Sequence, residues 1–407
     1  MINFEKVVEL TKRIGYARAL PGALNFLGLF LAIKLLGEEN YGVFSIAFGI
    51  VSIAIQVLFG LLIHGIVPLL SSDASQVSIR SISLKYAVIT AIALSIGAIL
   101  LFWLNSFYAI SILLVAFYGL DLVLLELLRM DSKFKIYGIV ALVRAISILI
   151  AIAFLWMFNT LTPFSFMVVY CLGSVMLIFT VFVKTNFYDS LFDKERIGSD
   201  LIKSMFDKGS KGTVVNLVDN SIPTILKIVI QASLGDIATS QFSSSVDLAK
   251  RIVGIVFNLT TFIGLPSVFT SFRLGLYDEA RRYQTFLFAY SSAAIFILAC
   301  IYSLAYASGL PVSGFIFQNN IFIFSLVSGS VLIQRSRKLI IDPMMIFSTP
   351  LKSIVIVGIL VTVTTLLISQ LAALRSVEMF SLQLVLASVI LFGAYWVVTK
   401  YARARMV

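Results

Sequence analysis

The chain has 407 residues, of which 60% are hydrophobic and 13% are charged, and its mean hydropathy is +1.03. Soluble domains have about 45–50% apolar and about 25% charged residues, so this composition excludes a soluble globular protein. The net charge of +11 would suggest a nucleic-acid partner for a soluble protein. Here the positions of the basic residues explain it as membrane topology, and we expect no nucleic-acid partner.

Twelve apolar runs follow one another along the chain, and each can span a hydrocarbon core, which takes about 20 helical residues. They lie at 14–36, 42–70, 81–104, 107–129, 135–158, 162–183, 212–234, 238–270, 284–308, 311–334, 351–374 and 379–399. Charged, amphipathic residues precede the first run, and no small-residue cleavage site follows it, so we expect no cleaved signal peptide. The sequence predicts an all-α, polytopic membrane protein with about twelve transmembrane helices.

The basic residues predict the orientation of these helices. If the N-terminus is cytoplasmic, 24 of the 31 basic residues fall in inside segments, one (Arg375) falls in an outside loop, and six lie within the spans. Basic residues concentrate on the cytoplasmic side of membrane proteins. We therefore expect a multi-pass protein of the inner (cytoplasmic) membrane with both termini in the cytoplasm.

The two halves of the chain resemble each other at a constant offset of 198 residues. This offset lays Leu36-Gly37 on Leu234-Gly235 and Pro68 on Pro266. Six spans per half make both halves start inside, which is typical of parallel repeats related by a pseudo-two-fold axis normal to the membrane. We predict an N-terminal six-helix lobe at 1–183, a cytoplasmic linker at 184–211 and a C-terminal six-helix lobe at 212–407.

The linker contains apolar residues at helical spacing among charged ones. These residues are Leu201, Ile202, Met205 and Phe206. Such a pattern is typical of an amphipathic helix that lies in the membrane interface.

Several ionisable residues lie deep within the spans, where each costs at least about 2.5–3.5 kcal/mol unless it faces water or a partner. The cations are Arg18, Arg144, Lys227, Lys250 and Arg251, and the acids are Asp121, Asp219 and Asp247. One interpretation is that these charges form ion pairs within the protein. Asp121 would then pair with Arg144, and Asp247 with Arg251, which lies one helical turn after it. The other is that the excess of cations binds an anionic cargo, because Lys and Arg bind phosphate well.

Other polar and helix-bending residues are candidates for cargo contact or gating. The seventh span carries a polar stripe that we expect to line a cleft: Asn216, Asp219, Asn220, Lys227 and Gln231. His64, the one histidine, is either a hydrogen-bonded packing residue or a proton relay. We expect Pro68 and Pro266 each to bend a span. Each bend is either a fixed structural kink or part of a gate. The candidates for ion coupling or gating are therefore Asp121, Asp219, Asp247, His64, Pro68 and Pro266.

The sequence contains no pattern that indicates enzyme chemistry. It has no nucleotide-binding glycine motif, no metal-ligand spacing and no nucleophile with a partnered base. Cys171 and Cys300 lie in apolar runs, where cysteines usually act as small hydrophobic residues. We expect a transporter without a resident cofactor or metal.

The segment KLLGEENYGVFS at 34–45 resembles the first hairpin of Wzx-type polysaccharide flippases. Val218-Asp219 and the segment from Ala232 to Ser243, followed by Pro266, are similar to the seventh and eighth helices of that family. The family belongs to the multidrug, oligosaccharidyl-lipid and polysaccharide exporter superfamily. The similarity in organisation covers nearly the whole chain.

This resemblance implies a MATE-like fold of two six-helix lobes around a cavity that opens to each side in turn. It implies a flippase that moves a polyprenyl-diphosphate-linked oligosaccharide to the outer leaflet for O-antigen or lipopolysaccharide synthesis, with H⁺ or Na⁺ as candidate coupling ions. Other polysaccharide-assembly proteins are candidate partners beside the bilayer. Arg144, Lys227, Lys250 and Arg251 would hold the diphosphate.

Two other functions stay open. A multidrug exporter of the same superfamily would present acidic groups to organic cations. A membrane enzyme or scaffold of polysaccharide assembly would transport nothing, although an enzyme acting outside would need a larger outer loop than this chain has.

Overall fold

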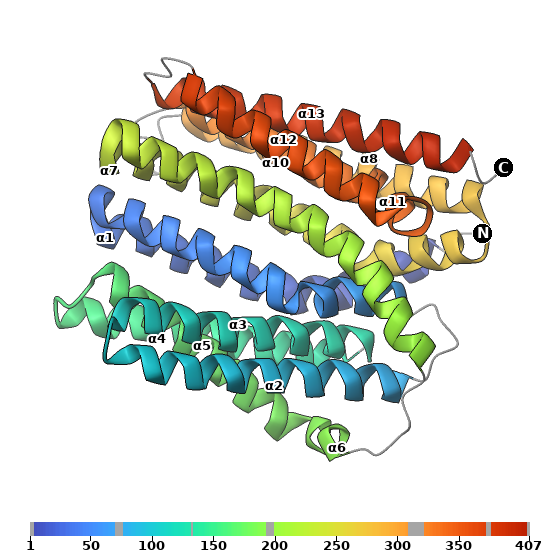
Figure 1. Cartoon of the computed structure of the whole chain (residues 1–407), viewed down its shortest axis with the longest axis horizontal. Helices are drawn as coiled ribbons and strands as arrows, with labels where there is room; N and C mark the ends of the chain where they lie inside the picture. Colours follow the sequence, from blue (N-terminus) through green and yellow to red (C-terminus); the bar gives the residue numbers. More distant parts are fainter. Residues whose placement is uncertain are drawn as a thin grey trace. The chain divides into compact units, whose positions relative to one another are not determined.

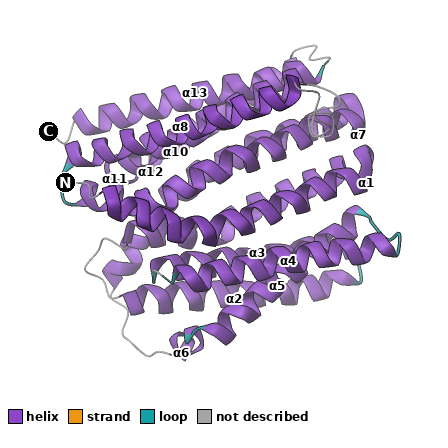
Figure 2. Ribbon diagram, turned by 180° about the vertical axis from the view of Figure 1, so that it is seen from behind, coloured by secondary structure: helices purple, strands orange, loops and turns teal. Residues whose placement is uncertain are grey.

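The structure is a computed structural model that describes residues 4–69, 76–131, 133–192, 199–307, 321–371 and 376–404. In these ranges every regular element is a helix, so the all-α prediction is confirmed (Figures 1 and 2). The helices are α1 Phe4–Leu69, α2 Gln76–Phe102, α3 Ser106–Met130, α4 Phe134–Met157, α5 Pro163–Lys184, α6 Phe187–Phe192, α7 Ser199–Arg273, α8 Tyr277–Ala307, α10 Ile321–Ile340, α11 Asp342–Ser348, α12 Leu351–Leu371 and α13 Val377–Ala404.

Eight of the described helices are long and apolar enough to cross a bilayer, and two of these are double length. The apolar part of α1, Ala17–Ile66, has 50 residues, and a straight helix of that length would measure about 75 Å, more than twice the hydrocarbon core. α1 and α7 therefore each supply two spans. α8 and α10 lie at the ninth and tenth predicted runs, of which residues 308–320 are outside the described part of the chain.

Both double-length helices break at a glycine. Gly37 in α1 has φ 74° and ψ 172°, and Gly235 in α7 has φ 86° and ψ −176°. This backbone conformation is essentially restricted to glycine. The two breaks lie 198 residues apart, at positions that the predicted repeat superposes. A glycine in the same backbone conformation thus forms the turn of the first helical hairpin in each half.

Replacing either break glycine with valine is expected to lower the free energy of unfolding by about 1–3 kcal/mol, the cost of holding a side chain in this backbone region. No atom lies near enough to clash with a Cβ at Gly37 or Gly235, so the loss would come from the backbone alone. Thermal unfolding in detergent measures it. Gly97→Ala in α2 is the control, because Gly97 is helical and equally unobstructed. Wild-type stability in both valine variants would contradict the assignment of these glycines.

Local capping residues set the ends of several spans. Asn105 accepts hydrogen bonds from the backbone N–H groups of Phe107 and Tyr108 at the start of α3. Thr162 and Ser165 form a reciprocal capping box at the start of α5, where Pro163 is the first helical residue. These are preferred residues at helix starts, and they explain why the predicted loops at 105–106 and 159–161 are so short.

The predicted linker differs from the structure in one respect. Residues 199–211 are the first turns of α7 and not a separate helix, and the short helix α6 precedes them. Met205 is buried and its sulfur accepts a hydrogen bond from Ser83 in α2, whereas Ile202 and Phe206 are exposed. The amphipathic pattern is real, but its apolar side partly packs on α2.

By compactness the chain divides into a unit at 1–224 and a unit at 225–407, so the boundary falls within α7. The predicted lobes at 1–183 and 212–407 follow the repeat and stay a prediction. In the first unit, α1 and α7 approach through small residues. A Cβ added to Gly209 would overlap the carbonyl oxygen of Leu61, and one added to Gly212 would lie 2.7 Å from Cβ of His64.

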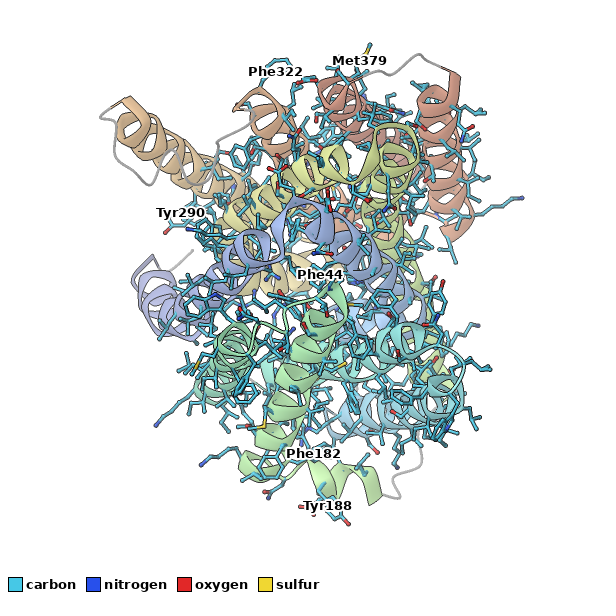
Figure 3. The ribbon with its side chains drawn as sticks, turned by 90° about the vertical axis from the view of Figure 1, so that its left-hand side faces the viewer. Phe44, Phe182, Tyr188, Tyr290, Phe322 and Met379 are labelled. Carbon is cyan, nitrogen blue, oxygen red and sulfur yellow. The ribbon has the colours of Figure 1, made fainter. Side chains whose placement is uncertain are left out.

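Large apolar side chains cover the outside of each unit. Figure 3 shows Phe44 among the ribbons and Tyr188, Phe322 and Met379 at the periphery, in line with the burial of Phe44 and the exposure of the other three. The exposed side chains of α2, α12 and α13 are mostly isoleucine, leucine and valine. A soluble protein rarely exposes such continuous apolar surface, whereas lipid covers it at no cost.

Candidate functional site

The first unit holds a buried ion pair between α3 and α4. Arg144 Nη1 lies 2.9 Å from Asp121 Oδ2, and the two side chains are 10% and 0% exposed. Ser174 in α5 donates a hydrogen bond to the same carboxylate oxygen at 3.0 Å. The pairing of Asp121 with Arg144 is therefore confirmed. Each charge neutralises the other at a depth where neither could remain alone.

Aromatic rings surround this pair. The Arg144 guanidinium lies 4.4 Å from the centre of the Tyr118 ring. Tyr118 contacts Phe48 of α1, which contacts Tyr170 of α5, with ring centres 6.0 and 5.1 Å apart. The rings exclude water, which strengthens the ion pair, and Tyr118 adds a cation–π contact. We call Asp121, Arg144, Ser174 and Tyr118 the N-unit ion-pair cluster.

Sequence reasoning identified two of these four residues. Tyr118 lies three positions before Asp121 and hence on the same helix face, a signal that was available in the sequence. Ser174 lies 53 residues away on another helix, and the sequence alone gives no sign of that pairing.

The second unit holds another ion pair, between the two halves of α7. Lys227 Nζ lies 3.1 and 3.3 Å from the two carboxylate oxygens of Asp247, and the side chains are 5% and 25% exposed. Twenty residues separate them in sequence, which would be about 30 Å along a straight helix. Their contact shows that α7 folds back at Gly235. The sequence predicted Arg251 as the partner of Asp247, and the structure shows Lys227 as a partner of this aspartate.

Lys250 and Arg251 follow this pair in the second half of α7, and both are half-buried. Gln231 donates a hydrogen bond of 2.7 Å to Asp236, so it lies at the turn beside the break. We call Lys227, Asp247, Lys250 and Arg251 the C-unit charge cluster. Its members come from two consecutive spans.

Breaking the Lys227–Asp247 pair on one side is expected to destabilise the protein more than removing both charges. Lys227→Met leaves a carboxylate within a span without its lysine, whereas the double variant Lys227→Met, Asp247→Leu leaves no charge. A double-mutant cycle by thermal unfolding should give a coupling of about 1–3 kcal/mol. Asp247 is a quarter exposed, so we expect the lower part of this range. Additive effects would contradict the pair.

Four more residues of the predicted site lie elsewhere in the first unit. Asp219 is buried, Asn216 and Asn220 are half-buried, and Asn216 donates to the carbonyl of Gly212 in its own helix. His64 Nε2 lies 2.9 Å from Gln56 Oε1, which favours the packing interpretation. That the polar stripe lines a cleft stays a prediction.

Arg18 and the two prolines complete the predicted set. Arg18 lies over the ring of Tyr137 in α4, at 5.2 Å from its centre. Pro68 is buried near the end of α1, and Pro266 lies within α7, which continues to Arg273. The structure thus brings the predicted residues together as two separate ion pairs, and a shared cavity for all the cations stays a prediction.

One further buried cation lies outside the predicted spans. Arg337 follows the run at 311–334, lies in α10, is 1% exposed, and pairs with Asp342 at 3.2 Å. Its guanidinium also lies 5.2 Å from the ring centre of Tyr395 in α13. Within the described ranges, no group of three or more His, Cys, Asp or Glu residues could hold a metal ion.

No protein-family model and no curated protein sequence matches this chain. Solved structures do. The chain is similar to a multidrug resistance MATE family transporter of the MOP superfamily in its outward-facing conformation (13% identity, 98% of this chain and 95% of that one, TM-score 0.62). It is similar to a Vibrio cholerae MATE transporter (12%, 98% and 96%, TM-score 0.61). A third match is a MOP superfamily transporter from Pyrococcus furiosus (13%, 98% and 95%, TM-score 0.59). The chain therefore has the fold of the MATE transporters, as the sequence predicted.

Proposed function

We propose that this protein is a membrane transporter that moves an amphiphilic cargo by alternating access. The observation that supports this most is the MATE fold over 98% of the chain, together with ion pairs buried within the spans. Buried charges in spans are costly and usually serve a transport pathway or a coupling ion. One fold can serve many functions, so the ion pairs within the spans are needed beside the fold to support transport.

The cargo that the comparisons favour is an organic, drug-sized molecule. One structural neighbour is named a multidrug resistance transporter. Both deeply buried cations of the predicted diphosphate site, Arg144 and Lys227, contact an aspartate at 3.1 Å or less. The positive charge that the sequence predicted for a cargo site is therefore partly neutralised by the two aspartates.

A lipid-linked oligosaccharide is the second candidate, and the C-unit charge cluster favours it. Lys250 and Arg251 add two half-buried cations three and four residues after Asp247, and cations suit a diphosphate. The Pyrococcus furiosus neighbour is described as a transporter whose binding pocket has a reverse polarity that suggests a different function. The prenyl tail of such a cargo would stay in lipid, because each CH₂ removed from water contributes about 0.8 kcal/mol.

The acidic partners are the candidates for ion coupling. Asp121 Oδ1 is buried and accepts no hydrogen bond from the described residues, so it can take a proton. Protonation of Asp121 or Asp247 would release a cation, and a cargo anion would compete for the same cation. H⁺ and Na⁺ are both compatible with this scheme.

Expression in bacteria decides between the two cargoes. A drug-sensitised strain should accumulate less of a fluorescent organic cation if the protein exports drugs. A strain that lacks its own flippase should regain surface polysaccharide if it moves lipid-linked sugar. Lys250→Gln, Arg251→Gln should leave export of the cation unchanged or faster and should impair the flippase activity. Wild-type protein that is folded, membrane-inserted and inactive in both strains would favour the scaffold or enzyme alternatives.

A further inference from the structure

An apolar groove runs between α12 and α13 in the second unit. Its volume is about 360 Å³, and its lining includes Val357, Thr364, Met379, Gln383 and Ala394. This volume is within the range of small-molecule sites, about 300–1,000 Å³. Exposed side chains of both helices line it, among them Leu360 of α12 and Leu382 of α13, and Figure 3 shows Met379 at the periphery. The groove therefore opens to lipid.

Gln383 contributes to this groove a buried polar atom that has no hydrogen-bond partner among the described residues. Its side chain is 4% exposed, and its Nε2 donates to the carbonyl of Thr365 across the helix pair. Its Oε1 is buried and accepts no hydrogen bond from any described residue. The hydroxyl of Thr365 is already committed to the carbonyl of Val361 at 2.7 Å. A buried acceptor without a donor costs about 1–3 kcal/mol, and hydrocarbon supplies no donor.

Gln383 Oε1 is a hydrogen-bond acceptor, so a ligand that binds to it must offer a hydrogen-bond donor. Esters, carboxylates and phosphodiesters offer acceptors only and cannot satisfy it. Among the described residues, no charged side chain lines the groove, so an ammonium group would be left uncompensated. A neutral hydroxyl fits. Gln383 is one of the residues that line the groove, so a hydroxyl bound there can donate to its Oε1.

The position of Gln383 suits the polar end of an amphiphile. It lies six residues into α13, about 9 Å from the start of that helix, while the lining continues about 16 Å further to Ala394. α13 has 28 residues and is about 42 Å long, which exceeds the hydrocarbon core by about 12 Å. Gln383 thus lies near one boundary of the core, and the apolar part of the groove extends inward from it.

We propose that the α12–α13 groove binds a neutral lipid-soluble amphiphile whose hydroxyl donates to Gln383 Oε1 and whose apolar chain lies along the groove toward Ala394. This site is independent of the cargo and of the two ion-pair clusters, none of whose residues line it.

The test compares two photoactivatable probes that differ in one hydrogen-bond donor, a long-chain alcohol and its methyl ether of equal chain length. Purified full-length protein in nanodiscs is labelled and the labelled peptides are identified by mass spectrometry. One buried hydrogen bond contributes about 0.5–1.5 kcal/mol, so we expect the alcohol to label α12 and α13 about 2- to 10-fold more than the ether.

Two variants separate recognition from folding. Gln383→Met should fold and label equally with both probes, because it removes the acceptor and keeps the groove. Thr364→Phe should fill the groove and lower labelling by both probes, with Gln383 intact. Equal labelling of wild-type α12 and α13 by alcohol and ether would overturn the proposal and leave the groove as a surface for ordinary acyl chains. Preferential labelling of other helices would overturn it as well.

Discussion

Replacing Asp121 with asparagine is expected to lower the free energy of unfolding by about 3–5 kcal/mol, because it leaves the Arg144 guanidinium buried without its counter-charge. Arg144 is 10% exposed, and aromatic rings surround it. Neither water nor a second acid among the described neighbours of the N-unit ion-pair cluster can take the place of the aspartate. Arg144→Met should be equally damaging, because it strands Asp121. Thermal unfolding in detergent, followed by intrinsic fluorescence, measures both effects.

Two controls test the cause. Asp207→Asn removes an ion pair with Lys211, and the Asp207 side chain is 58% exposed. This substitution should lower the free energy of unfolding by at most about 1 kcal/mol. The double variant Asp121→Leu, Arg144→Met should recover most of the loss, since an apolar pair replaces a buried ionic one. If this double variant were as unstable as the sum of the two single variants, the loss would come from packing and not from charge.

Gly209→Ala is the second change for which we expect a large effect, although it adds one methyl group. The new Cβ would overlap the backbone oxygen of Leu61 in α1, and a backbone atom cannot rotate away. We expect a loss of about 1–3 kcal/mol, the usual cost of overpacking. Gly209→Leu should yield no folded protein. The same thermal assay, combined with size-exclusion chromatography, checks both variants.

Gly97→Ala in α2 makes the opposite prediction from the same substitution. A Cβ at Gly97 meets no atom within 4 Å, so the change should stabilise its helix by up to about 1 kcal/mol. A midpoint that falls for Gly209→Ala and rises for Gly97→Ala would establish close approach of α1 and α7. Equal shifts of the unfolding midpoint with the same sign would contradict the close approach of α1 and α7 at Gly209.

The sequence predicted most of the fold because lipid imposes strict rules on composition. Each span must form all of its backbone hydrogen bonds internally and must stay apolar. The apolar runs, the short loops and the glycines at 37 and 235 can therefore be recognised in the sequence. The amphipathic spacing at 201–206 predicted a helix there, but it does not show whether that helix continues into the next span, as α7 does.

The site was predictable only where pairing is local or where few partners exist. Asp121 and Arg144 lie in adjacent spans, and few other charges compete there, so their pairing could be inferred. Lys227 meets Asp247 because α7 folds back at Gly235, which aligns residues 20 positions apart. Helical periodicity pointed only to Arg251, four residues after Asp247, and contains no information on Lys227. Arg337 and Ser174 depend on which helices are neighbours, and periodicity within one helix contains no such information.

Transport by the purified protein tests the central claim most directly. Wild-type protein in liposomes, with an imposed H⁺ or Na⁺ gradient, should move a fluorescent organic cation or a labelled lipid-linked oligosaccharide faster than empty liposomes. Asp121→Leu, Arg144→Met, which should remain folded, should lose coupling to the gradient. Flux of neither cargo above the empty-liposome rate, from protein shown to be folded and inserted, would contradict the account and leave a MATE fold that does not transport these cargoes.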